Sequence, residues 1–175
     1  MKTIFVDGYN VINSWGELNN IKNSINLESS REKLIEILID YSEFKGYKVF
    51  LVFDGHLIRG NLGEKIKVTK NLIVVYTKEM ETADSFIEKY VNRIGRKYEV
   101  CVVTSDNLEQ QIVFQRGSTR MSSIEFHNEV AKVKGKITSK AQKASNEKKY
   151  NRIEDQLDAA VFEKLDKIRK NDKKG

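Results

Sequence analysis

The sequence predicts an α/β fold, in which helices flank an open and mainly parallel sheet. Four short apolar runs, at residues 3–7, 48–54, 71–77 and 98–104, predict strands. Their apolar residues are continuous rather than alternating, as expected for strands that are covered on both faces. Helical patterns separate these runs, and strands that alternate with helices form parallel, right-handed units.

Helices are predicted where capping signals or helical spacing accompany an apolar face. Ser29 followed by Glu32 has the spacing of a capping box, and an apolar face then continues to Gly46, a typical helix stop. Apolar residues at helical spacing predict a second helix over about 83–94. The run SSIE at 122–125 is a further capping box and predicts another helix start.

The remaining segments have weaker signals. Residues 14–28 and 56–67 are predicted to be loops, the second of them mobile because of its glycines and basic side chains. Residues 116–121 fit either a short fifth strand or a turn. Residues 134–149 fit an extended arm or a helix that forms on binding, whereas helical spacing over 153–168 predicts a final amphipathic helix.

The net charge of +6 is concentrated in the C-terminal part of the chain. Residues 1–127 hold 17 basic and 17 acidic side chains, whereas residues 132–152 hold eight basic side chains and the single acid Glu147. Such a stripe attracts polyanions, although a solvated tail is the alternative for a charge run alone. We therefore predict two parts, a folded domain over 1–131 and a basic helical extension over 132–175.

The composition argues against several classes of protein. No apolar stretch is long enough to span a bilayer and no signal-peptide pattern precedes the first strand, so we expect a cytoplasmic protein with no membrane partner. The one cysteine, Cys101, excludes an internal disulfide and fits a buried strand position. No G-x-G-x-x-G follows the first strand and no G-x-x-x-x-G-K-[ST] is present, which argues against a dinucleotide site and a P-loop.

Acidic and amide side chains recur where this fold would gather them. Asp7, Asp54 and Asp106 follow predicted strands, Asn10 lies just beyond the first, and Asp84 begins a predicted helix. In open α/β sheets, ligands bind beyond the carboxyl ends of the strands. Clustered carboxylates repel one another unless a cation neutralises them, and Mg²⁺ or Mn²⁺ prefers such oxygen ligands. The pattern therefore favours a metal-dependent phosphodiesterase.

Each of these residues also has a purely structural interpretation. Asp84 near a helix start can interact with the helix dipole, and Asp106 can be an N-cap. Asp7 and Asp54 each precede a glycine, a pair that is common in turns. The functional interpretation depends on all four converging at one edge of the sheet.

Aromatic and basic residues are candidate RNA contacts. Tyr9 and Trp15 follow the first acidic residue, and exposed aromatic rings stack on unpaired bases. The alternative is that Trp15 packs beneath residues 14–28. The basic candidates rest on charge alone, and they are Arg59, Lys65, Lys67, Arg120, Lys132, Lys134, Lys136 and Lys140.

At these residues the chain resembles the bacterial YacP-type NYN endoribonucleases, relatives of the PIN-domain nucleases. The motifs that match in order and spacing are VDGYN at 6–10, VFDGH at 52–56, ETADSFIEK at 81–89 and VVTSD at 102–106. The segment GSTRMSSIE at 117–125 resembles a later motif of that family. The resemblance covers roughly the first three quarters of the chain.

This resemblance implies a PIN-like sheet, an Mg²⁺ or Mn²⁺ site and cleavage of mRNA in association with translating ribosomes. By position it assigns the catalytic set Asp7, Asn10, Asp54, Asp84 and Asp106, of which Asp7, Asp84 and Asp106 are the expected metal ligands. It also makes the predicted domain over 1–131 the catalytic NYN domain.

The leading hypothesis is therefore a metal-dependent endoribonuclease. A second hypothesis is a binding module that holds RNA or a ribosomal surface through residues 132–152 and cleaves nothing. A third is a metal-dependent phosphatase for small phosphoesters, which would not need the basic C-terminal part.

Overall fold

The structure is a computed structural model that describes residues 2–55, 62–94, 99–104, 118–145 and 161. The chain divides into two compact units, residues 1–134 and residues 135–175. The domain boundary predicted between residues 131 and 132 stays a prediction.

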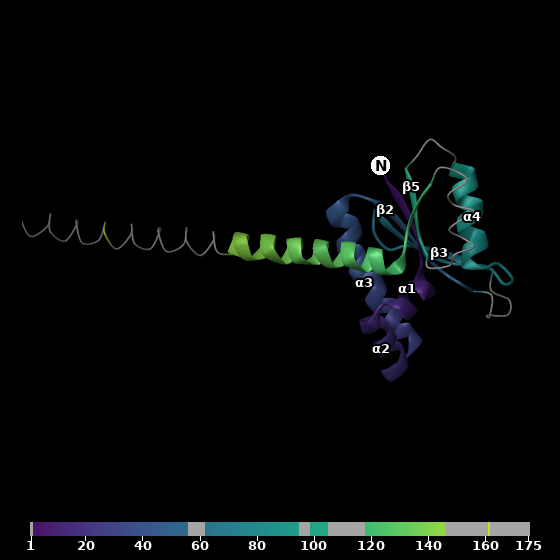
Figure 1. Cartoon of the computed structure of the whole chain (residues 1–175), viewed down its shortest axis with the longest axis horizontal. Helices are drawn as coiled ribbons and strands as arrows, with labels where there is room; N and C mark the ends of the chain where they lie inside the picture. Colours follow the sequence, from purple (N-terminus) through teal and green to yellow (C-terminus); the bar gives the residue numbers. More distant parts are fainter. Residues whose placement is uncertain (1, 56–61, 95–98, 105–117, 146–160, 162–175) are drawn as a thin grey trace, which may run out of the picture. The chain divides into compact units, whose positions relative to one another are not determined.

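The first unit is built on a six-stranded sheet with the order β3-β4-β2-β1-β5-β6 (Figure 1). All neighbouring strands are parallel except β3, which is antiparallel to β4. The chain builds outward from β1 in both directions, so a topological switch point lies beside this central strand. The strands are β1 (Thr3–Asp7), β2 (Lys48–Phe53), β3 (Glu64–Lys67), β4 (Leu72–Tyr76), β5 (Val100–Val103) and β6 (Thr119–Met121).

Helices cover both faces of the sheet, which explains the continuous apolar strands. On one face α4 packs Phe86 and Ile87 against a cluster that includes Phe5 and Val75 of the sheet. On the other face Phe126, from a helix that begins at residue 123, packs against side chains of the N-terminal helices. The helices are α1 (Gly8–Ser14), α2 (Gly16–Ser24), α3 (Leu27–Lys45), α4 (Ala83–Ile94) and the helix over residues 123–145.

The α/β class, the four predicted strands and the helix over 83–94 are confirmed, and residues 119–121 form a strand. Two caps are also confirmed. Gly46 ends α3 in the left-handed conformation with φ 66°. The N–H of Ser122 donates to Glu125 Oε2 at 2.8 Å, and the N–H of Glu125 donates back to Ser122 Oγ at 3.2 Å, which is a reciprocal capping box.

The loop predicted over residues 14–28 is wrong. Most of this segment belongs to α2 and the start of α3, and Trp15 between α1 and α2 is only 3% exposed. The predicted start of α3 is also wrong, because Asn26 is the N-cap and accepts the N–H of Ser29 at 2.7 Å. Asparagine caps helices as well as serine does.

The mobile loop predicted over residues 56–67 is wrong at its C-terminal end. Residues 64–67 form β3, whose side chains are all exposed, and they pair with β4 from Lys67↔Ile73 to Glu64↔Tyr76. Residues 56–61 lie outside the described residues. Residues 134–145 are helical, and the predicted helix over 153–168 lies outside the described residues apart from Val161.

Candidate functional site

Asp7 lies where β1 ends and α1 begins, at the switch point of the sheet. Its Oδ1 accepts the backbone N–H of Asn10 at 3.0 Å, so this carboxylate is the N-cap of α1. Burial raises the pKa of Asp7 to about 6. The backbone N–H groups of Asn10 and Tyr9 oppose this increase, because their hydrogen bonds favour the ionised carboxylate. The negative charges of Asp84 and Asp54 raise the pKa of Asp7 further.

The structure therefore brings two of the other predicted acids, Asp84 and Asp54, within electrostatic reach of Asp7. Asp54 follows β2, the neighbour of β1 in the sheet, and Asp84 lies in the first turn of α4. Both side chains are half-buried, as is Asp7. The charges of Asp84 and Asp54 oppose the ionisation of Asp7, and a bound cation would relieve this.

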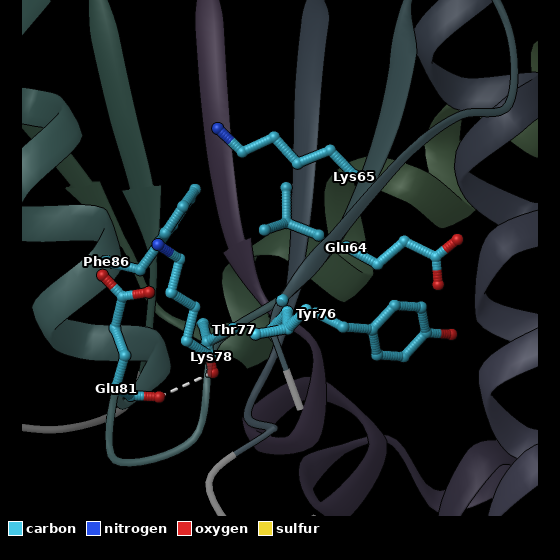
Figure 2. Close-up of a pocket in the computed structure, with 10 residues that line it drawn as sticks. Glu64, Lys65, Tyr76, Thr77, Lys78, Glu81 and Phe86 are labelled. Atoms are coloured by element: carbon cyan, nitrogen blue, oxygen red, sulfur yellow. Dashed lines mark hydrogen bonds between the residues drawn. The ribbon is translucent and has the colours of Figure 1, made fainter. Parts of the chain in front are cut away.

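Thr77 is a supporting residue that sequence reasoning missed. Its side chain is 1% exposed, and its Oγ1 accepts the N–H of Gly55 at 2.8 Å and donates to the carbonyl of Glu81 at 2.6 Å (Figure 2). Its own N–H donates to the carbonyl of Phe53 at 3.0 Å. Thr77 therefore ties the turn that carries Asp54 to the segment that leads into α4.

The start of α4 is fixed by Thr82. Its Oγ1 accepts the N–H of Ser85 at 3.2 Å, and its carbonyl accepts the N–H of Phe86 at 3.1 Å. This places Asp84 in the first helical turn, where the helix dipole favours a carboxylate. The dipole interpretation and the cluster interpretation of Asp84 are thus compatible.

Asn10 is held by the helix that begins at residue 123. Ser123, which is fully buried, donates its hydroxyl to Asn10 Oδ1 at 2.7 Å. The carbonyl of Ser123 accepts the indole N–H of Trp15 at 2.8 Å. Trp15 is therefore a buried anchor, and the prediction that its ring stacks on bases is wrong.

A second feature missed from sequence is a cation among aromatic rings. The guanidinium carbon of Arg31 lies 5.9 Å from the ring centroids of Tyr9 and Phe53 and 6.0 Å from that of Tyr76. Arg31 also pairs with Glu28 at 3.0 Å. Arg31 and Asp54 both act electrostatically on Tyr9, so this positive charge lies near the acidic residues.

The carboxylate oxygens of the acidic residues are the ligands that a hard cation prefers. The described part of the chain does not contain all of the predicted ligands. Among the described residues, no group of three His, Cys, Asp or Glu side chains is arranged to hold a metal ion. Asp106, the third predicted ligand, lies outside them. Its assignment, like those of Asp7 and Asp84 as ligands, stays a prediction.

The predicted basic contacts in the described part of the chain come from separate elements. Lys65 lies on β3 and Arg120 on β6, which are the opposite edges of the sheet. Arg59 lies outside the described residues. Four exposed lysines follow on the helix over 123–145, Lys132 and Lys134 in the first unit and Lys136 and Lys140 in the second.

In the described part of the chain no helix has the length and apolar character needed to cross a bilayer.

Comparison with known proteins gives consistent matches over almost the whole chain. Residues 4–170 match the YacP-like NYN domain family. The uncharacterized protein YacP of Bacillus subtilis (strain 168) is 34% identical over 173 residues, which are 98% of this chain and 99% of that protein.

Two crystal structures of Rae1 (YacP) from Bacillus subtilis are similar to this structure. One has a TM-score of 0.72 at 34% identity and covers 98% of this chain and 97% of the other. The second, of a mutant in which leucine replaces a tryptophan, has a TM-score of 0.71 at 32% identity and covers 83% of this chain and 85% of the other.

Proposed function

The chain belongs to the YacP-like NYN domain family, and we propose that it is a metal-dependent endoribonuclease that cleaves mRNA in association with translating ribosomes. Membership in this nuclease-like family supports an RNA-related nuclease function. The observation that supports catalysis at one place is the raised pKa of Asp7, about 6, beside Asp54 and Asp84. Perturbed carboxylates of this kind gather at functional sites.

The described carboxylates and Asp106 would hold Mg²⁺ or Mn²⁺, with Asp7, Asp84 and Asp106 as ligands. Such an ion, when bound, supplies a water of lowered pKa and positive charge beside the scissile phosphate. Asp7 is oriented for this role by the N–H of Asn10. Asn10 in turn has its side-chain oxygen fixed by Ser123, so neither group needs to reorganise when RNA binds.

The basic residues would hold the polyanionic substrate. Lysines at 132, 134, 136, 140 and 143 are all exposed, and residues 132–145 contain no acid. Such a run of exposed lysines binds phosphates through counterion release and is suited to RNA or to ribosomal RNA. The exposed lysines also support the alternative of a non-catalytic RNA- or ribosome-binding module, for which carboxylates would be dispensable.

Replacing one acid separates these two functions. We expect Asp84→Asn to reduce cleavage of a single-stranded RNA in Mg²⁺ or Mn²⁺ by about 100-fold or more, as for loss of a group that stabilises developing charge. Glu88→Gln, one turn further along α4, removes the same charge and should keep near wild-type cleavage. Undiminished cleavage by folded Asp84→Asn protein, checked by circular dichroism, would exclude the proposed site.

A further inference from the structure

Arg31 is a basic side chain of α3 that has no role in the proposed function so far, and it lies where strands of the sheet end. Its guanidinium carbon is 5.9 Å from the ring centroids of Tyr9 and Phe53 and 6.0 Å from that of Tyr76. Phe53 and Tyr76 are the last residues of β2 and β4, and Tyr9 lies in the first turn of α1. Figure 2 shows the Tyr76 ring directed away from Phe86, in agreement with its contact with Arg31.

These contacts place Arg31 near the acidic residues. Tyr9 is two positions after Asp7, and Phe53 directly precedes Asp54. Burial raises the pKa of the Tyr9 hydroxyl, the charge of Arg31 opposes this rise, and the charge of Asp54 adds to it. A polyanion bound at the acidic edge would therefore lie within electrostatic reach of the guanidinium.

Aromatic rings, more than hydrogen bonds, hold the inner side of this guanidinium. Among the residues that the structure describes, Arg31 Nε is buried without a hydrogen-bond partner. A guanidinium packed against rings keeps a fixed orientation, and its planar fork of N–H groups matches two oxygens of one phosphate. Arg31 is therefore oriented before any anion binds.

Glu28 shows that an anionic oxygen can reach the outer side of the guanidinium. Arg31 Nη1 lies 3.0 Å from Glu28 Oε2, and the two residues are three positions apart on α3. The Glu28 side chain is 59% exposed and the Arg31 side chain 20%, so this pair is open to water. Exposed ion pairs contribute little to stability, so a phosphate can replace this carboxylate at low cost.

We propose that Arg31 binds a backbone phosphate of single-stranded RNA at the acidic edge, and that Glu28 competes with this phosphate for the guanidinium. This inference rests on the proposed nuclease function. The half-buried acids repel a polyanion, and a fixed positive charge beside them offsets that repulsion. Arginine suits this position better than lysine, because it binds a phosphate through two parallel hydrogen bonds.

The first test is binding of a fluorescent single-stranded RNA to the full chain in EDTA, measured by fluorescence anisotropy. We expect Arg31→Gln to weaken binding at least about fivefold, as for loss of hydrogen bonds to a charged group. Arg31→Lys should recover only part of this loss, because it keeps the charge without the planar fork. The matched control is Lys33→Gln, which also breaks an ion pair of α3, the Lys33–Glu36 pair at 3.1 Å, and should bind within about twofold of the wild type.

The second test separates phosphate binding from a purely structural role of Arg31, and it leaves Arg31 in place. Glu28→Gln removes the competing carboxylate and should strengthen RNA binding by about threefold. Glu36→Gln removes the same charge from the same helix and should strengthen binding less. In protein that also carries Arg31→Gln, the extra gain from Glu28→Gln should disappear.

Equal RNA binding by Arg31→Gln and the wild type would overturn the proposal, as would equal losses in Arg31→Gln and Lys33→Gln. Equal gains in Glu28→Gln and Glu36→Gln would overturn it too, since Arg31 would then only tie α3 to the rings. If circular dichroism shows that Arg31→Gln is unfolded, the comparison of the two glutamate variants decides.

The assay needs neither metal nor cleavage, so its outcome is independent of the nuclease test. Absence of RNA binding by the wild type overturns the role of Arg31 even if RNA is cleaved in Mn²⁺. Arg31-dependent binding that Glu28 weakens supports this role even if no cleavage is found.

Discussion

The acidic edge of the sheet (Asp7, Asp54 and Asp84) and the lysines on the helix over 123–145 are two charged regions of this protein, and they are built in opposite ways. The acids are half-buried, and burial with mutual repulsion raises the pKa of Asp7 to about 6. The lysines at 132, 134, 136, 140 and 143 are exposed. Buried charge acts strongly over a few ångströms, whereas exposed charge acts weakly over a longer range that salt screens. The half-buried acids are therefore suited to chemistry at one point, and the exposed lysines to attracting a polyanion.

The largest expected effect comes from breaking the packing that positions the acidic edge. Gly8 follows Asp7, and a Cβ at this position would lie 2.3 Å from the ring of Phe53. We expect Gly8→Ala to lower the free energy of unfolding by about 3 kcal/mol, since overpacking a core forces side chains and backbone to move. Urea denaturation measures this.

Gly16→Ala is the matched control for that change. No atom lies within 4 Å of a Cβ at Gly16, which begins α2. We expect the free energy of unfolding to stay the same or rise by up to about 1 kcal/mol, because alanine reduces the freedom of the unfolded chain. Equal losses for both alanine variants would contradict the packing account.

The next effect concerns the charge of Asp7 itself. Its pKa is raised from 3.8 to about 6, so the folded protein loses stability as the pH rises from about 4 to above 6. Asp7→Asn does not titrate and still caps α1. Without divalent ions, we expect this variant to be more stable than the wild type by about 2 to 3 kcal/mol at pH 7.5, since one pKa unit corresponds to about 1.4 kcal/mol.

The difference between Asp7→Asn and the wild type should vanish near pH 4, where Asp7 is protonated. Thermal unfolding at several pH values measures it. Asp40→Asn, an exposed change of the same charge on α3, should stay within about 0.5 kcal/mol of the wild type at pH 7.5. A gain for Asp7→Asn that does not depend on pH would contradict the burial of a charged carboxylate.

The smallest effect per residue is expected at the lysines. Replacing Lys132, Lys136, Lys140 and Lys143 by glutamine should weaken RNA binding and reduce its dependence on salt. The slope of log affinity against log salt concentration should fall by roughly 0.7 for each lysine that contacts a phosphate of single-stranded RNA. Fluorescence anisotropy at several salt concentrations measures the slope, and an unchanged slope would exclude these lysines as phosphate contacts.

The sequence was sufficient to predict four of the six described strands, β1, β2, β4 and β5, and to place Asp7 and Asp54 at the ends of two of them. Buried parallel strands are continuous apolar runs, and the carboxyl ends of such strands meet at one edge. Asp54 lies within electrostatic reach of Asp7 for that reason, whereas Asp84 acts on Asp7 from the first turn of α4.

Elements with few apolar residues could not be predicted in the same way. The α1–α2 segment buries Gly8, Val11, Ile12, Trp15 and Leu18 at helical spacing, but polar side chains separate them and Trp15 lies between the two helices, so the signal is weaker than that of one long helix. The strand β3 has no buried residue, and its pairing with β4 determines its conformation.

The supporting roles of Ser123 and Thr77 could not be predicted from the sequence, because their hydrogen-bond partners are distant along the chain. Ser123 and Asn10 are 113 positions apart, and Thr77 and Gly55 are 22 positions apart. Neither pair has a local motif. Only the folded arrangement shows that a serine and a threonine hold the segments that carry the acids.

Mn²⁺ titration followed by electron paramagnetic resonance tests directly whether the acidic edge holds a divalent cation. We predict that the wild-type protein binds Mn²⁺ at pH 7.5 and that Asp7→Asn and Asp84→Asn each weaken binding by at least about tenfold. The four-lysine variant should bind Mn²⁺ as the wild type does. Equal Mn²⁺ affinity in the wild type and both aspartate variants would contradict the account and leave a protein that binds RNA through exposed charge alone.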